Sequence, residues 1–173
     1  MNLLAYPIGQ FDLAAPFAIA DGRAAVAEIA ALPARFRVAI CGLTDAQLDT
    51  PYRPGGWTVR QVAHHLADSH LNAYTRFKLA LTEDEPLIKT YQEHLWAELP
   101  DSQLGIEPSL ALLDGVHRRW AALLESLTET QWERRLRHPD FGKVALRPYA
   151  GLYAWHGRHH QAHVERLRER EGW

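Results

Sequence analysis

Hydrophobic residues recur every three or four positions along four long stretches of the chain, which is the spacing of amphipathic helices. These stretches predict helices from about Asp21 to about Ile40, from Thr58 to about Leu81, from about Glu107 onward, and from about Pro148 to about Arg170. Pro33 lies inside the first stretch, where its ring and missing N–H are expected to kink or interrupt the helix. The pattern therefore predicts four long helices.

Three sequence signals indicate where helices begin. Thr58 followed by Gln61 forms a capping box, in which each side chain bonds the backbone N–H of the other residue. It follows turn residues at 54–56 and so predicts a sharp start for the second helix. The same Thr-x-x-Gln spacing predicts single helical turns over Thr44–Leu48 and Thr128–Trp132.

The remaining segments lack the strict alternation of a β-strand, so the predicted fold class is all-α. Segments 83–105 and 138–147 are predicted as loops, and the first is long enough to act as a lid or binding loop. Four long helices with long crossover loops favour a four-helix bundle. The 173 residues, 47% of them apolar, suit one compact core, so a single domain over residues 1–173 is expected.

Composition narrows the class of protein. A net charge of −2 and a pI near 6.5 offer no basic surface, so neither nucleic acid nor a membrane is expected as a partner. The N-terminal segment 1–7 lacks the parts of a signal peptide, and no apolar run is long enough to span a membrane. Cys41 is the single cysteine, which fits a reducing compartment, and its apolar neighbours predict a buried packing role. We therefore expect a cytoplasmic protein that acts on a small molecule.

Histidine is concentrated in two places. Seven of the ten histidines lie within 64–70 and 156–163, and such clusters are typical of metal or acid–base sites. Near the C-terminus, His156/His160 and His159/His163 are each spaced i, i+4, which stacks two imidazoles on one helix face. With about 100° per residue, His156 and His160 straddle the centre of the apolar face, whereas the other pair lies nearer its edge. The wheel favours His156 and His160, although spacing alone does not choose between the pairs.

The second helix offers one further histidine beside the core. His65 lies at the edge of the apolar stripe, in a polar column that reaches Arg76 and stays within about 40° of His65 on the wheel. Such a column suits either a metal site or a plain interhelical hydrogen-bond network. His64 points away from the stripe and is expected to be solvated. His70 lies about 140° from His65, so these two are poor candidates for ligands of one ion.

Two longer motifs resemble a known family. The run 47–61 leads into His-His-Leu-Ala-Asp-Ser-His at 64–70, and a second motif, Trp-His-Gly-Arg-His-His-Gln-Ala-His, occupies 155–163. This pattern resembles the YfiT-like metal-dependent hydrolases, a branch of the DinB superfamily, along nearly the whole chain. The resemblance implies a four-helix bundle, usually a homodimer, with one divalent ion held by three histidines. The family's ligand positions map to His65, His156 and His160.

Three neutral imidazoles would leave a bound ion its full charge and an open coordination position, as in catalytic zinc sites. Such an ion lowers the pKa of bound water to about 7. One divalent ion per chain is predicted. Zinc is preferred, and nickel, manganese and iron also accept three imidazoles.

The sequence shows no evident general base. Zinc proteases of the His-Glu-x-x-His type place glutamate after the first histidine of the pair, where this chain has Gly157. Asp68 lies about 60° from His65 on the wheel and is the predicted catalytic carboxylate, with an ordinary surface charge as the alternative. Arg76 and Tyr153 are predicted to line the pocket and to bind a substrate or cofactor.

Two reaction classes and one non-enzymatic role are compatible with this site. The resemblance favours a metal-dependent hydrolase that activates water. The missing carboxylate favours a metal-dependent S-transferase that activates a low-molecular-weight bacterial thiol, because coordination deprotonates a thiol without a separate base. A metal-binding stress-response bundle without catalysis is the third alternative.

Overall fold

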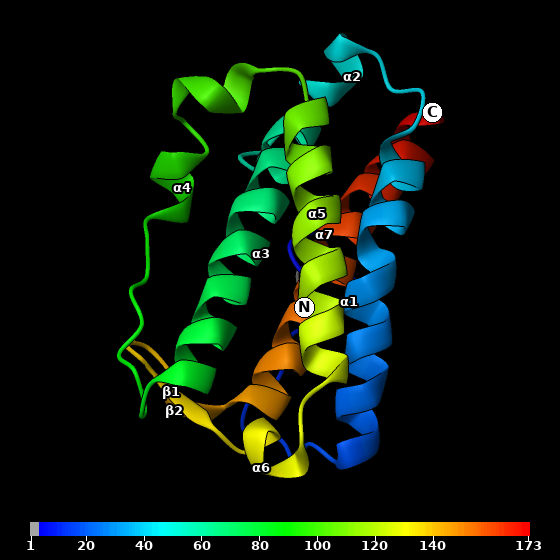
Figure 1. The fold of residues 1–173 in the computed structure, drawn as a ribbon. Coiled ribbons are helices and arrows are strands. Elements are labelled where there is room, and N and C mark those ends of the chain that lie inside the picture. The colour runs from blue at the N-terminus through cyan, green and yellow to red at the C-terminus, as the bar shows by residue number, and fades with distance from the viewer. Residues whose placement is uncertain (1–3) are drawn as a thin grey trace.

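The four long helices form where the hydrophobic spacing predicts them (Figure 1). The computed structural model describes residues 4–173, so residues 1–3 of the N-terminal segment lie outside the described residues. The elements in chain order are α1 (Ile19–Ile40), α2 (Asp45–Leu48), α3 (Val59–Thr82), α4 (Glu93–Trp96), the 3₁₀ helix η1 (Pro100–Gln103), α5 (Glu107–Glu125), α6 (Glu129–Trp132), β1 (Arg135–His138), β2 (Gly142–Ala145) and α7 (Leu146–Glu171).

The predicted helix starts are confirmed. Thr44, Thr58 and Thr128 each accept a hydrogen bond from the backbone N–H three residues later, and the glutamine at that position closes the capping box. Pro33 was expected to kink or interrupt the first helix; α1 continues through it to Ile40, so it does not interrupt the helix.

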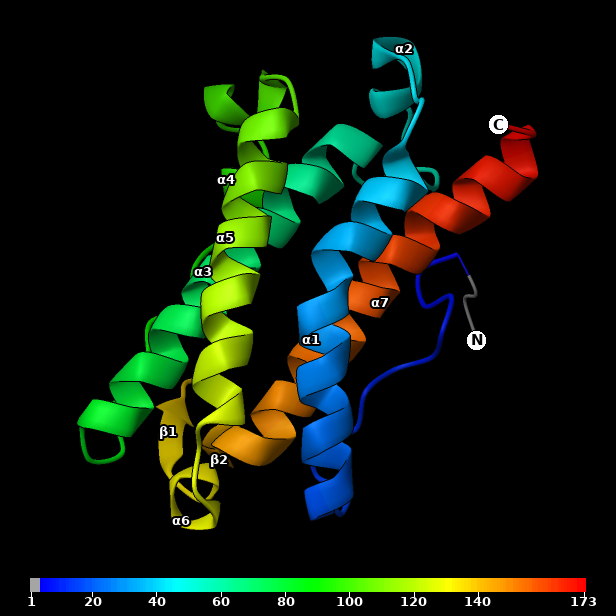
Figure 2. The same cartoon turned by 45° about the vertical axis from the view of Figure 1, so that its right-hand side comes forward.

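The order of the helices requires one long connection. α1 packs against α5 and α7, and α3 packs against the same two helices. α1 and α7 run in one direction and α3 and α5 in the other (Figures 1 and 2). Because α3 and α5 run parallel, residues 83–106 travel the length of the bundle to join them. This α3–α5 crossover contains α4 and η1, and it covers one side of α3 (Figure 1).

One expectation about the loops is wrong. Segment 138–147 was predicted as a loop, but β2 lies within it and pairs with β1, which ends at its first residue. The two strands form an antiparallel hairpin with register from Arg135↔Ala145 to His138↔Gly142. Leu87 of the crossover adds a parallel bridge to Arg137. Each strand has four residues, which is too short for alternation to stand out in the sequence. The bundle is confirmed, with this hairpin added at one end.

Buried histidines divide the core into two apolar clusters. On α1 one cluster ends at Ile29 and the other begins at Leu32. On α5 the boundary lies between Leu113 and Trp120, and the buried His117 lies between them. A polar layer therefore crosses the middle of the bundle, where every long helix passes from one cluster to the other.

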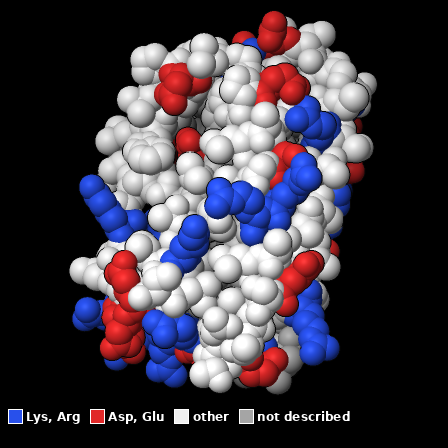
Figure 3. Space-filling view, in the orientation of Figure 1, with Lys and Arg blue, Asp and Glu red and all other residues white. Residues whose placement is uncertain are grey.

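The surface carries both signs of charge. Acidic and basic side chains are interspersed among uncharged ones on the face shown in Figure 3. Among the described residues, no helix combines the length and the apolar character that crossing a membrane requires.

Candidate metal centre

His65 of α3 and His156 and His160 of α7 meet in the polar layer, and we call them the three-histidine cluster. The Nε2 atom of His156 is 3.3 Å from Nε2 of His65 and 3.2 Å from Nε2 of His160. Ligand atoms of all three residues lie within 4.8 Å of one another. The structure thus brings together the residues selected by the wheel and the resemblance.

The spacing of these nitrogens suits a metal ion. With metal–nitrogen distances of about 2.1 Å, two nitrogens bound tetrahedrally lie about 3.4 Å apart. Hydrogen bonds among the rings suit the arrangement less well, because a neutral ring nitrogen has either one N–H or one lone pair, so His156 Nε2 cannot complete a hydrogen bond with both neighbours. One ion would satisfy three converging lone pairs at once, so the cluster can hold a metal.

The cluster is electrically neutral at pH 7. Burial lowers the pKa of His65 to about 4. It lowers the pKa of His156 and of His160 well below the usual value, and the neighbouring imidazoles lower both further. Neutral imidazole is the form that binds a metal, so the fold keeps these side chains ready for coordination.

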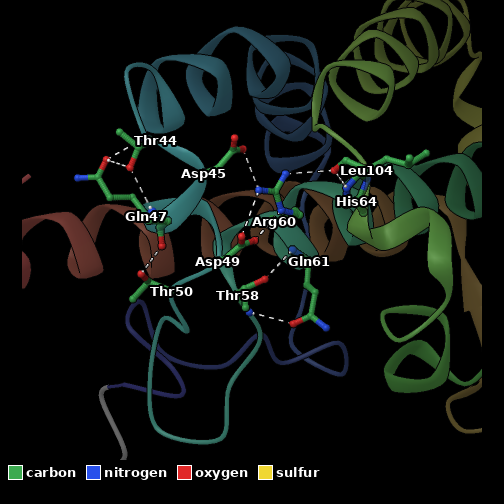
Figure 4. Close-up of polar contacts among 11 residues, drawn as sticks. Thr44, Asp45, Gln47, Asp49, Thr50, Thr58, Arg60, Gln61, His64 and Leu104 are labelled. Carbon is green, nitrogen blue, oxygen red and sulfur yellow. Dashed lines mark hydrogen bonds and ion pairs between the residues drawn. The ribbon is translucent and has the colours of Figure 1, made fainter.

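The start of α3 is held in place by a buried arginine. Arg60 donates hydrogen bonds to Asp49 at 2.6 Å and to Asp45 at 3.0 Å (Figure 4). It also donates to the carbonyl oxygen of Leu104 at 3.2 Å. These bonds connect α2, the start of α3 and the α3–α5 crossover, and so hold in place the end of the helix that carries His65.

A cavity of about 550 Å³ opens beside the cluster. His156 is the cluster member that lines it, and the ring of Trp57, 4.5 Å from that of His65, forms part of its wall. The crossover, the hairpin, α3 and α7 supply the other lining residues, which are Ser69, Arg76, Thr90, Tyr91, Gln92, Glu93, His94, His138, Asp140, Phe141, Tyr149, Leu152 and Tyr153. The long crossover therefore helps to form the pocket, as its length predicts.

Arg76 and Tyr153 line this cavity together. The buried guanidinium of Arg76 donates to the hydroxyls of Tyr149 at 3.2 Å and Tyr153 at 3.1 Å, and to the carbonyl oxygen of Lys89 at 2.8 Å. Within residues 4–173 it forms no ion pair with a carboxylate. Burial raises the pKa of the Tyr153 hydroxyl well above its usual value and so keeps it protonated. This wall presents a positive charge and hydroxyl groups to the pocket.

Asp68 does not join the cluster. In the part of the chain that the structure describes, its carboxyl group makes no hydrogen bond with any of the three histidines. Burial and the nearby Asp101 raise the pKa of this carboxyl group. The catalytic role of Asp68 stays a prediction. Glu93, which sequence reasoning missed, lines the cavity; desolvation raises the pKa of its carboxyl group, and the charge of Arg76 opposes that rise.

The structure corrects the expectation for His64 and places the second histidine pair of α7. His64, expected to be solvated, is buried, with Nδ1 2.7 Å from the Ser109 hydroxyl and Nε2 3.2 Å from the Leu104 carbonyl oxygen. The crossover covers the face of α3 that the wheel leaves open. His159 and His163 are also buried, but their Nε2 atoms lie 3.0 Å from each other and outside the cluster.

The expectation for Cys41 is wrong, because its side chain is exposed. α1 ends at Ile40, so Cys41 lies in the following turn and not on the apolar face. Sequence reasoning also left His70 and His117 without a role. Both are fully buried, and His70 lies within hydrogen-bond distance of His156 and of His117.

Comparison with known proteins agrees with this geometry. The DinB superfamily profile matches residues 28–164. A "Putative metal-dependent hydrolase" of Bacillus cereus is 54% identical over 173 residues, covering 100% of both chains. A relative of the same description from Bacillus anthracis is 53% identical over the same length.

Two solved structures are also similar. YfiT from Bacillus subtilis, a "probable metal-dependent hydrolase with an unusual four-helix bundle topology", superposes with a TM-score of 0.95 at 47% identity over 99% of each chain. TT2238, a four-helix bundle protein, shares the fold with a TM-score of 0.57 at 21% identity over 88% of this chain and 99% of its own. The chain belongs to the DinB superfamily, in its YfiT-like branch.

Proposed function

We propose that this protein is a metal-dependent hydrolase of a small-molecule substrate, with its ion held by the three-histidine cluster. The observation that carries the proposal is the convergence of three neutral Nε2 atoms beside a cavity large enough for a small molecule. The descriptions of full-length relatives support the reaction class. A divalent ion bound there supplies a Lewis acid that activates water near neutral pH, and zinc suits the three-imidazole set.

The chain's own residues have distinct roles in this proposal. Arg76 and Tyr153 bind and orient the substrate, because both present donors to the cavity. The guanidinium of Arg76 forms no ion pair with a carboxylate of residues 4–173, which favours a substrate that bears an anionic group such as a carboxylate. Glu93 is the carboxyl group proposed to carry a proton, since it lines the same cavity and desolvation raises its pKa against the opposing charge of Arg76.

A specific observation also favours the S-transferase alternative. No carboxylate of residues 4–173 is hydrogen-bonded to the cluster, and Gly157 has no room for a side chain because Leu32 packs against it. A thiol substrate needs no separate base, since coordination to the ion favours its thiolate. The cationic wall at Arg76 would suit a thiol that also bears an acidic group.

The deciding assay incubates zinc-loaded protein with esters and amides, and with an alkyl halide and an epoxide, each with and without low-molecular-weight thiols. Hydrolysis that needs no thiol and is lost in His65→Ala supports the hydrolase. Consumption of an electrophile only with thiol, without hydrolysis, contradicts it and supports the S-transferase. His159→Ala is the matched control, because this histidine lies outside the cluster. Zinc binding without turnover of any kind would favour a metal-binding protein that is not an enzyme.

A further inference from the structure

Behind His156, two more histidines form a continuous hydrogen-bonded line through the bundle. His156 Nδ1 is 3.1 Å from His70 Nε2, and His70 Nδ1 is 2.8 Å from His117 Nε2. His117 Nδ1 is 2.5 Å from the carbonyl oxygen of Ile29. These four residues belong to α7, α3, α5 and α1 respectively, so each long helix contributes one group. The side chains of His70 and His117 have 0% exposure, so water does not compete for these bonds.

The two ends of the line require the same direction of donation. A carbonyl oxygen only accepts, so Nδ1 of His117 carries its proton and Nε2 accepts from His70. His70 therefore carries its proton on Nδ1, and its Nε2 accepts from Nδ1 of His156. The lone pair of His156 is then on Nε2, which faces His65 and His160. Metal coordination at Nε2 requires that same tautomer. The carbonyl oxygen of Ile29 and the candidate metal site therefore favour the same tautomer of His156.

Pro33 explains why the carbonyl of Ile29 is available. In an α-helix this carbonyl would accept from the backbone N–H of residue 33, and proline has none. The Nδ1–H of His117 supplies the missing donor. The hydrogen bond that Pro33 leaves unmade in α1 is thus replaced by one from a buried histidine of α5.

We propose that His70 and His117 are positioning residues that hold His156 in the tautomer and ring orientation that bind the metal ion. The proposal rests on the proposed metal site but on neither proposed reaction. Metal-bound histidines usually donate their second N–H to a carboxylate, a backbone carbonyl or water. Here two neutral imidazoles take that place, which anchors the ligand without adding negative charge beside the ion.

The packing around the line favours this role. The rings of His70 and His117 stack with centroids 4.9 Å apart and an interplanar angle of 17°. Trp120 packs edge-on against both rings, and Tyr153 packs edge-on against His70. By contrast, Nδ1 of His160 is buried without a partner. His156 is therefore the cluster member whose orientation is supported by hydrogen bonds that reach across the bundle.

Zinc affinity of variants, measured by competition with a chelator, tests the proposal. His70→Leu removes the acceptor for His156 and should weaken zinc binding about 10- to 100-fold, as is typical for partners of metal ligands. His117→Leu should weaken it in the same direction by a smaller factor, because it acts through His70. His70→Gln, which offers both a donor and an acceptor, should recover part of the affinity. The matched control is His163→Leu, a buried histidine of α7 outside the line, which should bind zinc like the wild type.

Nitrogen-15 NMR of the imidazole rings gives a readout that does not depend on zinc or on any variant. In the metal-free wild type, His70, His117 and His156 should each carry the proton on Nδ1. A proton on Nε2 of His70, or wild-type zinc affinity in folded His70→Leu, would overturn the proposal. If a leucine variant fails to fold, as judged by circular dichroism, the ring protons and His70→Gln still decide. If the wild type binds no zinc, the proposed function fails, whereas the ring protons still test the line.

Discussion

Gly157 of α7 lies so close to Leu32 of α1 that a β-carbon at position 157 would be 2.9 Å from Cδ1 of the leucine and nearer still to Cδ2. Here α1 and α7 approach each other directly beside His156. The position at which zinc proteases carry their glutamate is therefore filled by a neighbouring helix. The missing base follows from the packing of the bundle, and any proton acceptor must come from the cavity side.

Replacing Gly157 with alanine should destabilise the protein by about 1–3 kcal/mol, because overpacking forces the two helices apart. The free energy of unfolding in urea, measured by circular dichroism, checks this. The matched control is Gly115→Ala in α5, where a β-carbon meets nothing within 4 Å. That change should stabilise the protein by up to about 1 kcal/mol, from helix propensity alone. Equal stability of the two variants would contradict the close packing at Gly157.

Removing a cluster histidine should abolish metal binding. His160→Ala leaves two imidazoles, so we expect purified protein to contain no stoichiometric metal by elemental analysis, whereas His159→Ala should retain one ion per chain. Metal removal with a chelator should lower the unfolding free energy of the wild type by about 3 kcal/mol relative to protein at a free zinc concentration of about 100 times the Kd. The same treatment should leave His160→Ala unchanged. Full occupancy in His160→Ala would show that this residue is not a ligand.

Local signals in the sequence predicted most of the fold. Thr44, Thr58 and Thr128 start helices because a capping box needs only residues three positions apart. His156 and His160 could be selected because they share one helix face. His65 was added to this pair because of the resemblance and because it lies at the edge of an apolar stripe. The structure places all three residues together.

Features that depend on contacts far apart in the sequence were not predictable. The wheel separates His70 from His65 correctly, but it cannot show that His70 bonds His156 instead. His64 looks solvated on an isolated helix, and only the crossover covers it. The short hairpin forms because β1 and β2 pair with each other, and neither strand alternates for long enough to be seen alone.

The metal-free protein should lose stability as the pH falls below about 6.5. Burial lowers the pKa of His65, His117 and His159 to about 4 and the pKa of His163 to about 3. Below the usual histidine pKa the unfolded chain takes up protons that the folded chain does not. With respect to these groups, stability is therefore constant above a pH of about 6.5 and falls progressively toward a pH of about 4.

Urea unfolding at pH 7.5 and pH 5.5, at constant ionic strength, measures this loss. His163→Leu should show a smaller difference between the two pH values, because it removes one of the groups that drive it. Saturating zinc should reduce the loss, since the ion competes with protons for the cluster. A metal-free protein that is equally stable at both pH values would show that the buried histidines are not responsible for acid sensitivity.

A homodimer is expected in solution, from the resemblance to the YfiT-like family and from apolar side chains on the surface. Leu95, Leu99 and Leu104 are exposed along the α3–α5 crossover, and exposed apolar groups of this kind favour association. Sedimentation velocity at micromolar concentration should show a species of twice the 19.7 kDa chain mass. Leu95→Asp combined with Leu99→Asp should shift it to the monomer. A wild-type species of chain mass would contradict the prediction.

The substrate's charge should be recognised at Arg76. Its guanidinium is buried, lines the cavity and forms no ion pair with a carboxylate among residues 4–173. An anionic group of the substrate would therefore form an ion pair with it. Arg76→Gln keeps a donor near the hydroxyls of Tyr149 and Tyr153 but removes the charge. For an anionic substrate we expect kcat/KM to fall by at least about tenfold, since hydrogen bonds to charged groups contribute about 1.5–3 kcal/mol.

A neutral analogue of the same size separates this role from a structural one. Loss of the charge should leave turnover of the neutral analogue nearly unchanged in Arg76→Gln, and zinc affinity should stay at the wild-type value, because Arg76 is not in the cluster. Arg76→Lys retains the charge but not the two-pronged geometry, so it should recover only part of the discrimination. If both substrates slow equally in Arg76→Gln, the guanidinium supports the cavity wall through Tyr149 and Tyr153 and does not select the substrate.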